Sequence, residues 1–590
     1  MNERRAPVVR VGFPASEGIA RGRVRRIVWR IPELPHTVVQ DSSSARELER
    51  FHSALDHARR ELERIKAATE ARLGHVEARI FDPQILMLDD PEVVDGTARY
   101  IRENRLAAAR AFDWRMLELK ELWSRTSHPM FLDRLNDLAD LRFRVLGRLL
   151  DLPSPWRAGD TDGIVIVARE LAPSLVAGLD PERVAALATD EGTRTSHWAI
   201  LARSLGIPAV AGLGDIAATT SDGQAIIVDG RSGRVVVEPD RREAEHFRRR
   251  RAAIRGWERE LRASAGEEAI TLDQRGVVLR ANLDLPGEAL QARRHGADGV
   301  GLFRTEFLVV GRHTVPDEEE QYRAYRIVTE AFRGRAVFIR TFDLGGDKFP
   351  VFLHMPPEEN PFLGRRGVRV CLEESELFLT QLRAILRAGA HGDVRIMIPM
   401  VNTVSELAAV RELLDTAGNQ LGREGIPFAR EIKVGAMIET PAAALKAPEL
   451  AAHADFLSIG TNDLVQYTLA IDRTSTRLAH QFDEFDPAVL RMIAGVARAG
   501  RSRGIEVGAC GEMAARPLGA AILLGLGVEA LSVAWASLPE IRKLVRSFRL
   551  DDLRAAASDV LEAPTSTDAK RALTESLGDV LDVGVFPLGT

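Results

Sequence analysis

The chain has 590 residues, enough for about two to four domains, and this excludes a single small module. Hydrophobic residues make up 45% and charged residues 28%, a balance typical of folded domains and unlike that of disordered chains. The formal net charge is −5, so the overall field gives no reason to expect a nucleic-acid partner. The two cysteines, Cys371 and Cys510, are too few for a disulfide framework or a four-cysteine zinc site.

The beginning of the chain lacks the apolar core of a signal peptide. No window approaches the roughly 18 uninterrupted apolar residues of a membrane span. We therefore expect a cytoplasmic protein that inserts into no membrane.

In chain order, the pattern of apolar and charged residues changes twice within the first 240 or so residues. Residues 8–28 and 163–239 carry short β-rich runs separated by Gly, Asp and Pro. Residues 37–152 are charged, with apolar residues at helical spacing. This pattern predicts an α/β domain built from residues 1–36 and 153–239, with a helical domain, residues 37–152, inserted into it.

The next segment is rich in arginine and covers residues 240–270. Its run Arg248-Arg-Arg-Arg251 could be part of a nucleic-acid patch. Interleaved glutamates and apolar spacing favour a solvated helix instead. We predict a linker helix here.

Residues 271–590 alternate short apolar strands with helical stretches, which predicts a TIM barrel whose chemistry lies where the strands end. The overall fold class is therefore multidomain α/β. The eight predicted strands are Val277–Asn282, Gly299–Phe303, Val337–Thr341, Val394–Pro399, Lys433–Ile438, Phe456–Gly460, Glu506–Ala509 and Ala530–Ala534.

The predicted strand ends carry many cations. Guanidinium groups bind phosphate and carboxylate oxygens at two points, so a cluster of them indicates a site for a polyanion. For any single arginine a surface salt bridge is the alternative. The cations are Arg304, Arg340, Arg366, Arg473 and Lys348.

Two carboxylates and a thiol occupy neighbouring predicted strand ends. Glu439 and Asp463 offer hard oxygen ligands that suit Mg²⁺ shared with a substrate's oxygens. Cys510 has room to meet a ligand, and a thiol of usual pKa about 8.5 is mostly protonated at neutral pH. It can serve as a proton donor or a nucleophile, with a buried structural cysteine as the alternative. Cys371 has no such setting and is predicted to be structural.

His197 stands where a helix is expected to begin. A strand, a glycine turn at Gly192 and a Thr/Ser cap at residues 195–196 precede it, and Gly206 with Pro208 closes the helix. There the helix dipole favours the neutral, nucleophilic imidazole and would stabilise an attached phosphoryl group. A capping or packing histidine is the alternative.

The chain contains its own comparison for this motif. Arg125-Thr-Ser-His128 repeats the tetrapeptide that contains His197, but without a preceding strand or glycine turn, and Pro129 follows it. The tetrapeptide is therefore weak evidence by itself, and only the surrounding pattern singles out His197.

These motifs resemble enzyme I of the bacterial phosphoenolpyruvate-dependent phosphotransferase system, in the same order over nearly the whole chain. The matching segments include Gly12–Gly22, Ile80–Leu88, Gly192–Gly212 and Ser458–Arg473. Two positions depart from the family pattern: Thr193 replaces a usual glycine, and Trp198 is bulkier than the residue expected after the histidine. Neither change removes a reacting group.

The resemblance implies a role for each site residue. His197 matches the histidine that becomes phosphorylated, Cys510 the acid that protonates the enolate of departing pyruvate, and Glu439 with Asp463 the Mg²⁺ ligands. The residues in the family's phosphoenolpyruvate-binding motifs are Arg304, Arg340, Asn462, Arg473, Arg366 and Lys348. The family passes the phosphoryl group to the small carrier HPr in the first step of sugar uptake.

The resemblance also implies that the α/β domain swivels, that the helical insert docks HPr, and that the barrel forms a homodimer. A nitrogen-regulatory relative of enzyme I is the main alternative, although no sensory domain precedes the α/β domain. Pyruvate phosphate dikinase and phosphoenolpyruvate synthase are less favoured, because no Gly-rich nucleotide loop is present. The intact set of reactive residues argues against a non-catalytic scaffold.

Overall fold

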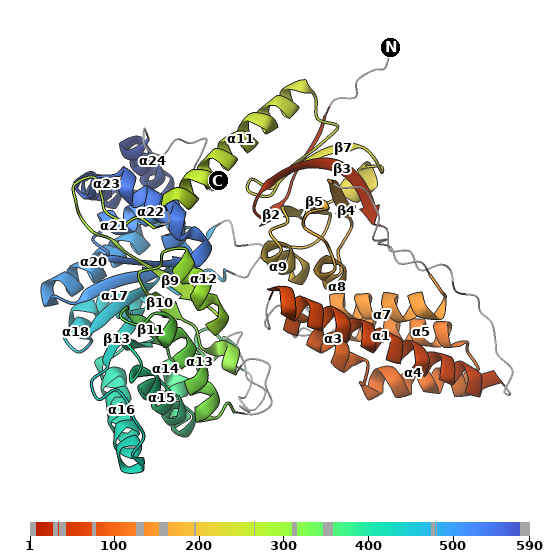
Figure 1. Cartoon of the computed structure of the whole chain (residues 1–590), viewed down its shortest axis with the longest axis horizontal. Coiled ribbons are helices and arrows are strands. Elements are labelled where there is room, and N and C mark those ends of the chain that lie inside the picture. The colour runs from red at the N-terminus through yellow and green to blue at the C-terminus, as the bar shows by residue number, and fades with distance from the viewer. Residues whose placement is uncertain are drawn as a thin grey trace. The chain divides into compact units, whose positions relative to one another are not determined.

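The computed structural model describes residues 7–27, 34, 43–73, 78–124, 135–152, 163–193, 196–264, 266–309, 315–345, 358–473, 478 and 481–578. They fall into two compact units that divide between Ala252 and Ala253. This boundary lies inside helix α11 (Arg241–Ser264; Figure 1).

The first unit contains an eight-stranded mixed sheet in the order β1-β8-β7-β3-β4-β5-β6-β2. Strands β3 and β4 pair in parallel although the helical segment separates them in the sequence. The prediction of an α/β fold with a helical insertion is therefore confirmed. The strands are β1 (Val8–Val11), β2 (Phe13–Ser16), β3 (Ile19–Ile27), β4 (Ile164–Ala168), β5 (Val184–Thr189), β6 (Ala209–Ala211), β7 (Ala225–Asp229) and β8 (Arg234–Val237).

The inserted helices share one buried apolar cluster with the short helices beside the sheet. A buried hydrogen bond from Ser174 Oγ to Asp140 Oδ2, 2.7 Å long, also joins the two parts. The inserted helices are α1 (Ser44–Leu73), α3 (Asp82–Met87), α4 (Pro91–Glu103), α5 (Ala108–Ser124) and α7 (Leu135–Leu149). The helices beside the sheet that share this cluster are α8 (Pro173–Ala177) and α9 (His197–Ser204), whereas α10 (Ile216–Thr219) packs in a second apolar cluster.

The first half of α11 packs against the sheet of the first unit. Phe247 is buried against Ile227 and Val236. Arg234 donates two hydrogen bonds to the carboxylate of Glu243, at 2.8 and 3.0 Å. Within the arginine-rich run, Arg250 Nη1 lies 3.1 Å from Asp229 Oδ2 and the Arg251 guanidinium lies over the Phe247 ring.

The second unit is a closed barrel of eight parallel strands. Each predicted strand is present with its ends shifted by at most one residue, so the predicted TIM barrel is confirmed. The strands are β9 (Val278–Leu283), β10 (Val300–Phe303), β11 (Val337–Arg340), β12 (Val394–Ile398), β13 (Lys433–Ile438), β14 (Phe456–Gly460), β15 (Glu506–Cys510) and β16 (Ala530–Ala534).

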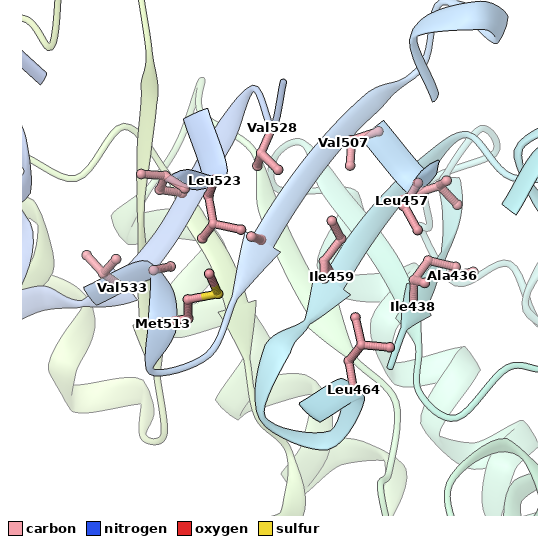
Figure 2. Packing of buried hydrophobic residues seen from close by; sticks show 14 of the residues in the cluster. Ala436, Ile438, Leu457, Ile459, Leu464, Val507, Met513, Leu523, Val528 and Val533 are labelled. Atoms are coloured by element: carbon pink, nitrogen blue, oxygen red, sulfur yellow. The ribbon is translucent and has the colours of Figure 1, made fainter. Parts of the chain in front are cut away.

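The barrel has two apolar layers, because successive residues of a strand point to opposite faces. The outer layer packs the strands against the helices, as Figure 2 shows for Ile438, Ile459 and Val507. The inner layer fills the barrel and includes Phe338 and Phe456, whose ring centroids lie 4.7 Å apart in a T-shaped arrangement. Cys510 also belongs to this inner layer.

The helices of the second unit have clear end signals. Helix α16, for example, begins with a capping box between Thr403 and Glu406 and ends at Gly425, whose φ is 68°. The helices are α12 (Ala289–Arg294), α13 (Glu318–Ala331), α14 (Val368–Glu373), α15 (Ser375–Gly389), α16 (Val404–Glu424), α17 (Pro441–Leu445), α18 (Ala447–Ala451), α19 (Thr461–Leu469), α20 (Pro487–Arg503), α21 (Pro517–Gly525), α22 (Leu538–Ser547), α23 (Leu550–Glu562) and α24 (Ser566–Leu577).

Within the described ranges, we find no helix with the length and apolar composition needed to cross a bilayer.

Candidate active site

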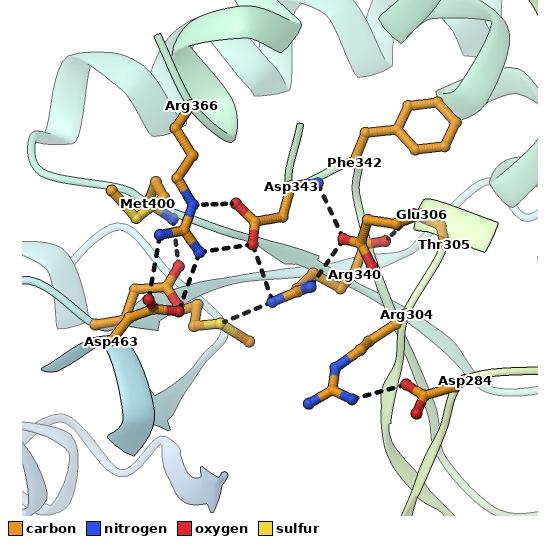
Figure 3. Close-up of polar contacts among 12 residues, drawn as sticks. Asp284, Arg304, Thr305, Glu306, Arg340, Phe342, Asp343, Arg366, Met400 and Asp463 are labelled. Carbon is orange, nitrogen blue, oxygen red and sulfur yellow. Dashed lines mark hydrogen bonds and ion pairs between the residues drawn. The ribbon is translucent and has the colours of Figure 1, made fainter. Parts of the chain in front are cut away.

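Charged side chains from different strands meet at the carboxyl ends of the barrel (Figure 3). Arg304 follows β10, Arg340 ends β11, Glu439 follows β13 and Asp463 lies in the first turn of α19. Cys510 ends β15. TIM-barrel enzymes carry their catalytic residues at this edge of the barrel, and the reactive groups of this chain lie there as well.

Arg366 lies at the centre of this network and is 2% exposed. Nε and Nη2 donate to the two oxygens of Asp343, both at 3.0 Å, while Nη1 and Nη2 donate to those of Asp463, both at 3.1 Å. Nη1 also donates to the Tyr467 hydroxyl at 3.0 Å. A guanidinium has five N–H groups, so in this structure Arg366 has none left for a substrate. Its observed role is to hold two carboxylates.

Arg340 is also buried, and carboxylates hold it in place. Its Nη2 donates to Glu306 Oε1 at 2.8 Å, and its Nη1 lies 3.5 Å from Asp343 Oδ2. Burial lowers the pKa of Arg340, but the charges of Glu306 and Asp343 outweigh this effect and raise it. Arg340 therefore stays a cation in a site from which water is largely excluded.

Glu439 is a buried acid whose Oε1 accepts the main-chain N–H of Met400 at 2.7 Å. Burial, followed by the negative charges of Asp463 and Asp343, raises the pKa of Glu439 to about 8. In the part of the chain that the structure describes, Glu439 forms no ion pair. Among the described residues the acid thus lies near like charges without a directly paired cation, although the charges of Arg366 and Arg340 lower its pKa.

This donor set fits Mg²⁺. Among the described residues, no three His, Cys, Asp or Glu side chains group together as a metal site. Glu439 and Asp463 offer two carboxylates, and Mg²⁺ commonly takes one or two carboxylates together with substrate oxygens. The raised pKa of Glu439 is the property expected of a ligand that binds a cation in place of a proton.

Cys510 is 2% exposed, and its Sγ accepts a hydrogen bond from Ser458 Oγ at 3.6 Å. Burial raises the pKa of the Cys510 thiol, and the Ser458 hydrogen bond lowers it by less. The thiol is therefore protonated at neutral pH, as a proton donor must be. Cys371 is buried too, but its Sγ donates to the main-chain oxygen of Phe342 at 3.4 Å, which fits a structural cysteine.

The other predicted substrate-binding residues are less enclosed. The Arg304 side chain is 37% exposed, and its Nη1 donates to Asp284 Oδ1 at 2.7 Å. Asn462 is half-buried, and its Oδ1 accepts the N–H of Glu512 at 3.0 Å. Arg473, also half-buried, lies shortly after the end of α19.

Lys348 lies outside the described residues.

Two site residues were not assigned from the sequence. Glu306 and Asp343, which hold Arg340, are 7% and 0% exposed. The sequence did indicate these two acids, because each follows a predicted cationic residue within three positions, in Arg304-x-Glu306 and Arg340-x-x-Asp343. Buried cations need counter-charges, and the nearest acids along the chain were the natural candidates.

In the first unit, His197 is the first residue of α9, as predicted. Gly192 adopts a left-handed φ of 105°, and Gly206 follows the helix with a φ of 68°. One detail of the prediction was wrong: Ser196 occupies the N-cap position, but its side chain does not cap the helix. Its Oγ instead accepts the N–H of Thr193 at 2.9 Å, which tightens the preceding turn.

The structure accommodates both departures from the expected motif. Thr193 does not have a positive φ, so this position does not require glycine. Trp198 is 3% exposed and packs into the core of the first unit, so its indole is not presented on the surface beside His197.

Comparison with known proteins gives matches along most of the chain. Three family models match: "PEP-utilising enzyme, N-terminal" over residues 11–134, "PEP-utilising enzyme, mobile domain" over 160–233, and "PEP-utilising enzyme, PEP-binding domain" over 258–550. The mobile-domain match contains His197, and the PEP-binding match contains the carboxyl ends of the barrel strands.

Whole proteins match as well. The phosphoenolpyruvate-protein phosphotransferase of Geobacillus stearothermophilus is 38% identical over 94% of this chain and 96% of its own length. The proteins of that name from Staphylococcus carnosus and Bacillus subtilis are both 36% identical. These alignments cover 94% and 96% of this chain and 97% and 99% of those proteins.

Proposed function

This chain belongs to the phosphoenolpyruvate-protein phosphotransferases, and from this premise we propose that His197 takes the phosphoryl group of phosphoenolpyruvate and passes it to a carrier protein of the HPr type. The barrel binds phosphoenolpyruvate, and pyruvate leaves. The observation that carries the proposal is the set of buried, carboxylate-held cations at the carboxyl ends of the barrel strands.

Substrate binding is assigned to the cations that can still offer N–H groups. Arg304, with Arg473 and the amide of Asn462, would bind from the more exposed side, and Arg340 from the buried side. Their charges match a substrate that carries a phosphate and a carboxylate. Arg366 acts as a positioning residue, since it holds Asp463 and Asp343.

Glu439 and Asp463 are the residues that would hold Mg²⁺. When bound, the ion would neutralise negative charge on the substrate oxygens and polarise them. Arg366 orients Asp463, because it donates to both of its oxygens. Glu439 must lose its proton to act as a ligand.

The proposed reaction is a phosphoryl transfer followed by protonation of the enolate. A neutral ring nitrogen of His197 attacks phosphorus in line, the bond from phosphorus to the enol oxygen breaks, and the enolate of pyruvate is left. Cys510 then donates its S–H proton to the enolate carbon, and pyruvate forms. The thiolate recovers a proton from solvent before the next turnover.

Carrier docking on residues 37–152 and dimerisation through the barrel complete the proposal. Both rest on the family resemblance. Binding assays with carriers of the sugar-uptake and nitrogen-regulatory types distinguish the two branches, and sedimentation of the purified chain measures its oligomeric state.

The decisive experiment uses phosphoenolpyruvate labelled with ³²P, with Mg²⁺. The wild-type chain is expected to take up acid-labile label, and His197→Ala none. His128→Ala is the matched control, since His128 lies in the same tetrapeptide, and should be labelled like the wild type. Stable labelling of His197→Ala would contradict the proposal. Labelling from ATP instead of phosphoenolpyruvate would favour the dikinase alternative.

A further inference from the structure

We propose that Ser458 is a positioning residue for Cys510: its hydroxyl hydrogen bond directs the thiol proton toward the substrate and stabilises the thiolate left after proton donation. The inference rests on the proposed role of Cys510. It concerns a serine inside the barrel, on the strand next to that of Cys510.

The geometry places the two side chains together in the barrel interior. Ser458 lies in β14 and Cys510 at the end of β15, and their side chains are 5% and 2% exposed. Ser458 pairs in register with Gly508, and Cys510 lies two residues further along β15, on the same face of the sheet as Ser458. Ser458 Oγ lies 3.6 Å from Cys510 Sγ, a normal distance for a hydrogen bond to sulfur.

The direction of this hydrogen bond matters for the chemistry. The Ser458 hydroxyl donates and the sulfur accepts, so the S–H proton of Cys510 is not used in this contact. When Cys510 protonates the enolate, an S–H bond breaks and a C–H bond forms, and the sulfur becomes an anion. A hydrogen bond to an anion is roughly twice as strong as one to a neutral group, so the contact strengthens as the proton leaves.

Other charges also face the thiol. Arg340 and Arg304 favour the thiolate, and Glu439 disfavours it. Arg340 is paired with Glu306 and Asp343, and Arg304 with Asp284. Among the described residues, Ser458 is the only side chain that donates a hydrogen bond directly to Cys510 Sγ.

A substitution next to Ser458 that keeps its hydroxyl can serve as a control. A cavity of about 10 Å³ is lined by residues that include Ser458, Gly508 and Ser532. A Cβ added at Gly508 would make only ordinary contacts, the nearest at 3.5 Å to the main-chain oxygen of Ala530. Gly508→Ala therefore alters the space next to Ser458 without removing the hydroxyl.

The first experiment measures pyruvate formation by the full chain in a single turnover with phosphoenolpyruvate and Mg²⁺. Ser458→Ala is expected to lower the maximal rate about tenfold, with an unchanged half-saturating phosphoenolpyruvate concentration and a larger solvent deuterium isotope effect. Ser458→Val is also expected to lower the maximal rate. Ser458→Thr, whose side chain has the same shape as valine but keeps the hydroxyl, should retain most of the wild-type rate. Gly508→Ala should react like the wild type.

A double-mutant cycle separates this inference from the proposed function. If Ser458 acts through Cys510, Ser458→Ala causes no further loss of rate in a Cys510→Ala chain. An equal loss in both backgrounds, or a wild-type rate and isotope effect in Ser458→Ala, would overturn the inference. If Cys510→Ala itself keeps the wild-type rate, the proposed role of Cys510 fails first.

Discussion

Arg366 and Asp343 form a two-point ion pair, in which Nε and Nη2 of the arginine each donate to a different carboxylate oxygen at 3.0 Å. Both side chains are buried, at 2% and 0% exposed. The same guanidinium also pairs with both oxygens of Asp463. One arginine therefore compensates two buried acids, and one of these acids is a proposed metal ligand.

Arg366→Met is expected to destabilise the barrel by about 3 to 5 kcal/mol, because it leaves the buried Asp463 without its cation and leaves Asp343 with Arg340 alone. Denaturant unfolding of the full chain, followed by the transition of the barrel, measures this loss. The matched control is the neighbouring Arg365, which pairs with Glu373 and whose side chain is 29% exposed. Arg365→Met should cost less than about 1 kcal/mol. Equal costs for the two variants would contradict the assignment.

Stability without Mg²⁺ should fall as the pH rises from about 4.5 to 8, because of Glu439. Its pKa is raised to about 8 in the folded chain from an ordinary value of 4.5. The folded state therefore binds the extra proton in this window, and losing that proton favours unfolding.

Glu439→Gln removes this titration. At pH 8.5 without Mg²⁺ the variant is expected to be more stable than the wild type by about 1 to 3 kcal/mol, and near pH 5 the two should be equal. Added Mg²⁺ should stabilise only the wild type. Glu431→Gln, at an exposed position, serves as the control and should change neither result. A pH-independent difference for Glu439→Gln would argue against a raised pKa.

Gly192→Ala is expected to destabilise the first unit by about 1 to 3 kcal/mol. Gly192 has a φ of 105°, and an added Cβ would lie 3.0 Å from Trp198 Nε1. Thr193→Gly, one position further on, should cost less than about 1 kcal/mol. Thermal unfolding of the first unit measures both variants, and a larger loss for Thr193→Gly would show that the turn is described wrongly.

Neither cysteine should react quickly with a thiol reagent in the native chain. Cys371 and Cys510 are 3% and 2% exposed, and burial raises the pKa of both thiols. Titration with a disulfide reagent is expected to detect no rapidly reacting thiol under native conditions and both thiols in denaturant. Rapid native reaction of Cys510, tested in Cys371→Ala, would show that the barrel interior is open to solvent.

The sequence by itself determined the order of the elements and the residues at the strand ends. Strands β9 to β16 were predictable because runs such as Val394–Ile398 are short, apolar and bounded by polar turns. The strands of a TIM barrel all run in the same direction, so Arg304, Glu439 and Cys510 could be assigned to one edge of the barrel from the sequence alone. Local pattern and known topology were sufficient for this.

Only the tertiary structure decided which charges pair. Arg366 looked like Arg340 in the sequence, but its donors are all used by Asp343, Asp463 and Tyr467, which come from distant parts of the chain. The contact between Ser458 and Cys510 likewise depends on the register of two parallel strands. Hydrogen-bond partners, burial and pKa depend on groups brought together in space, and the order of residues along the chain does not specify them.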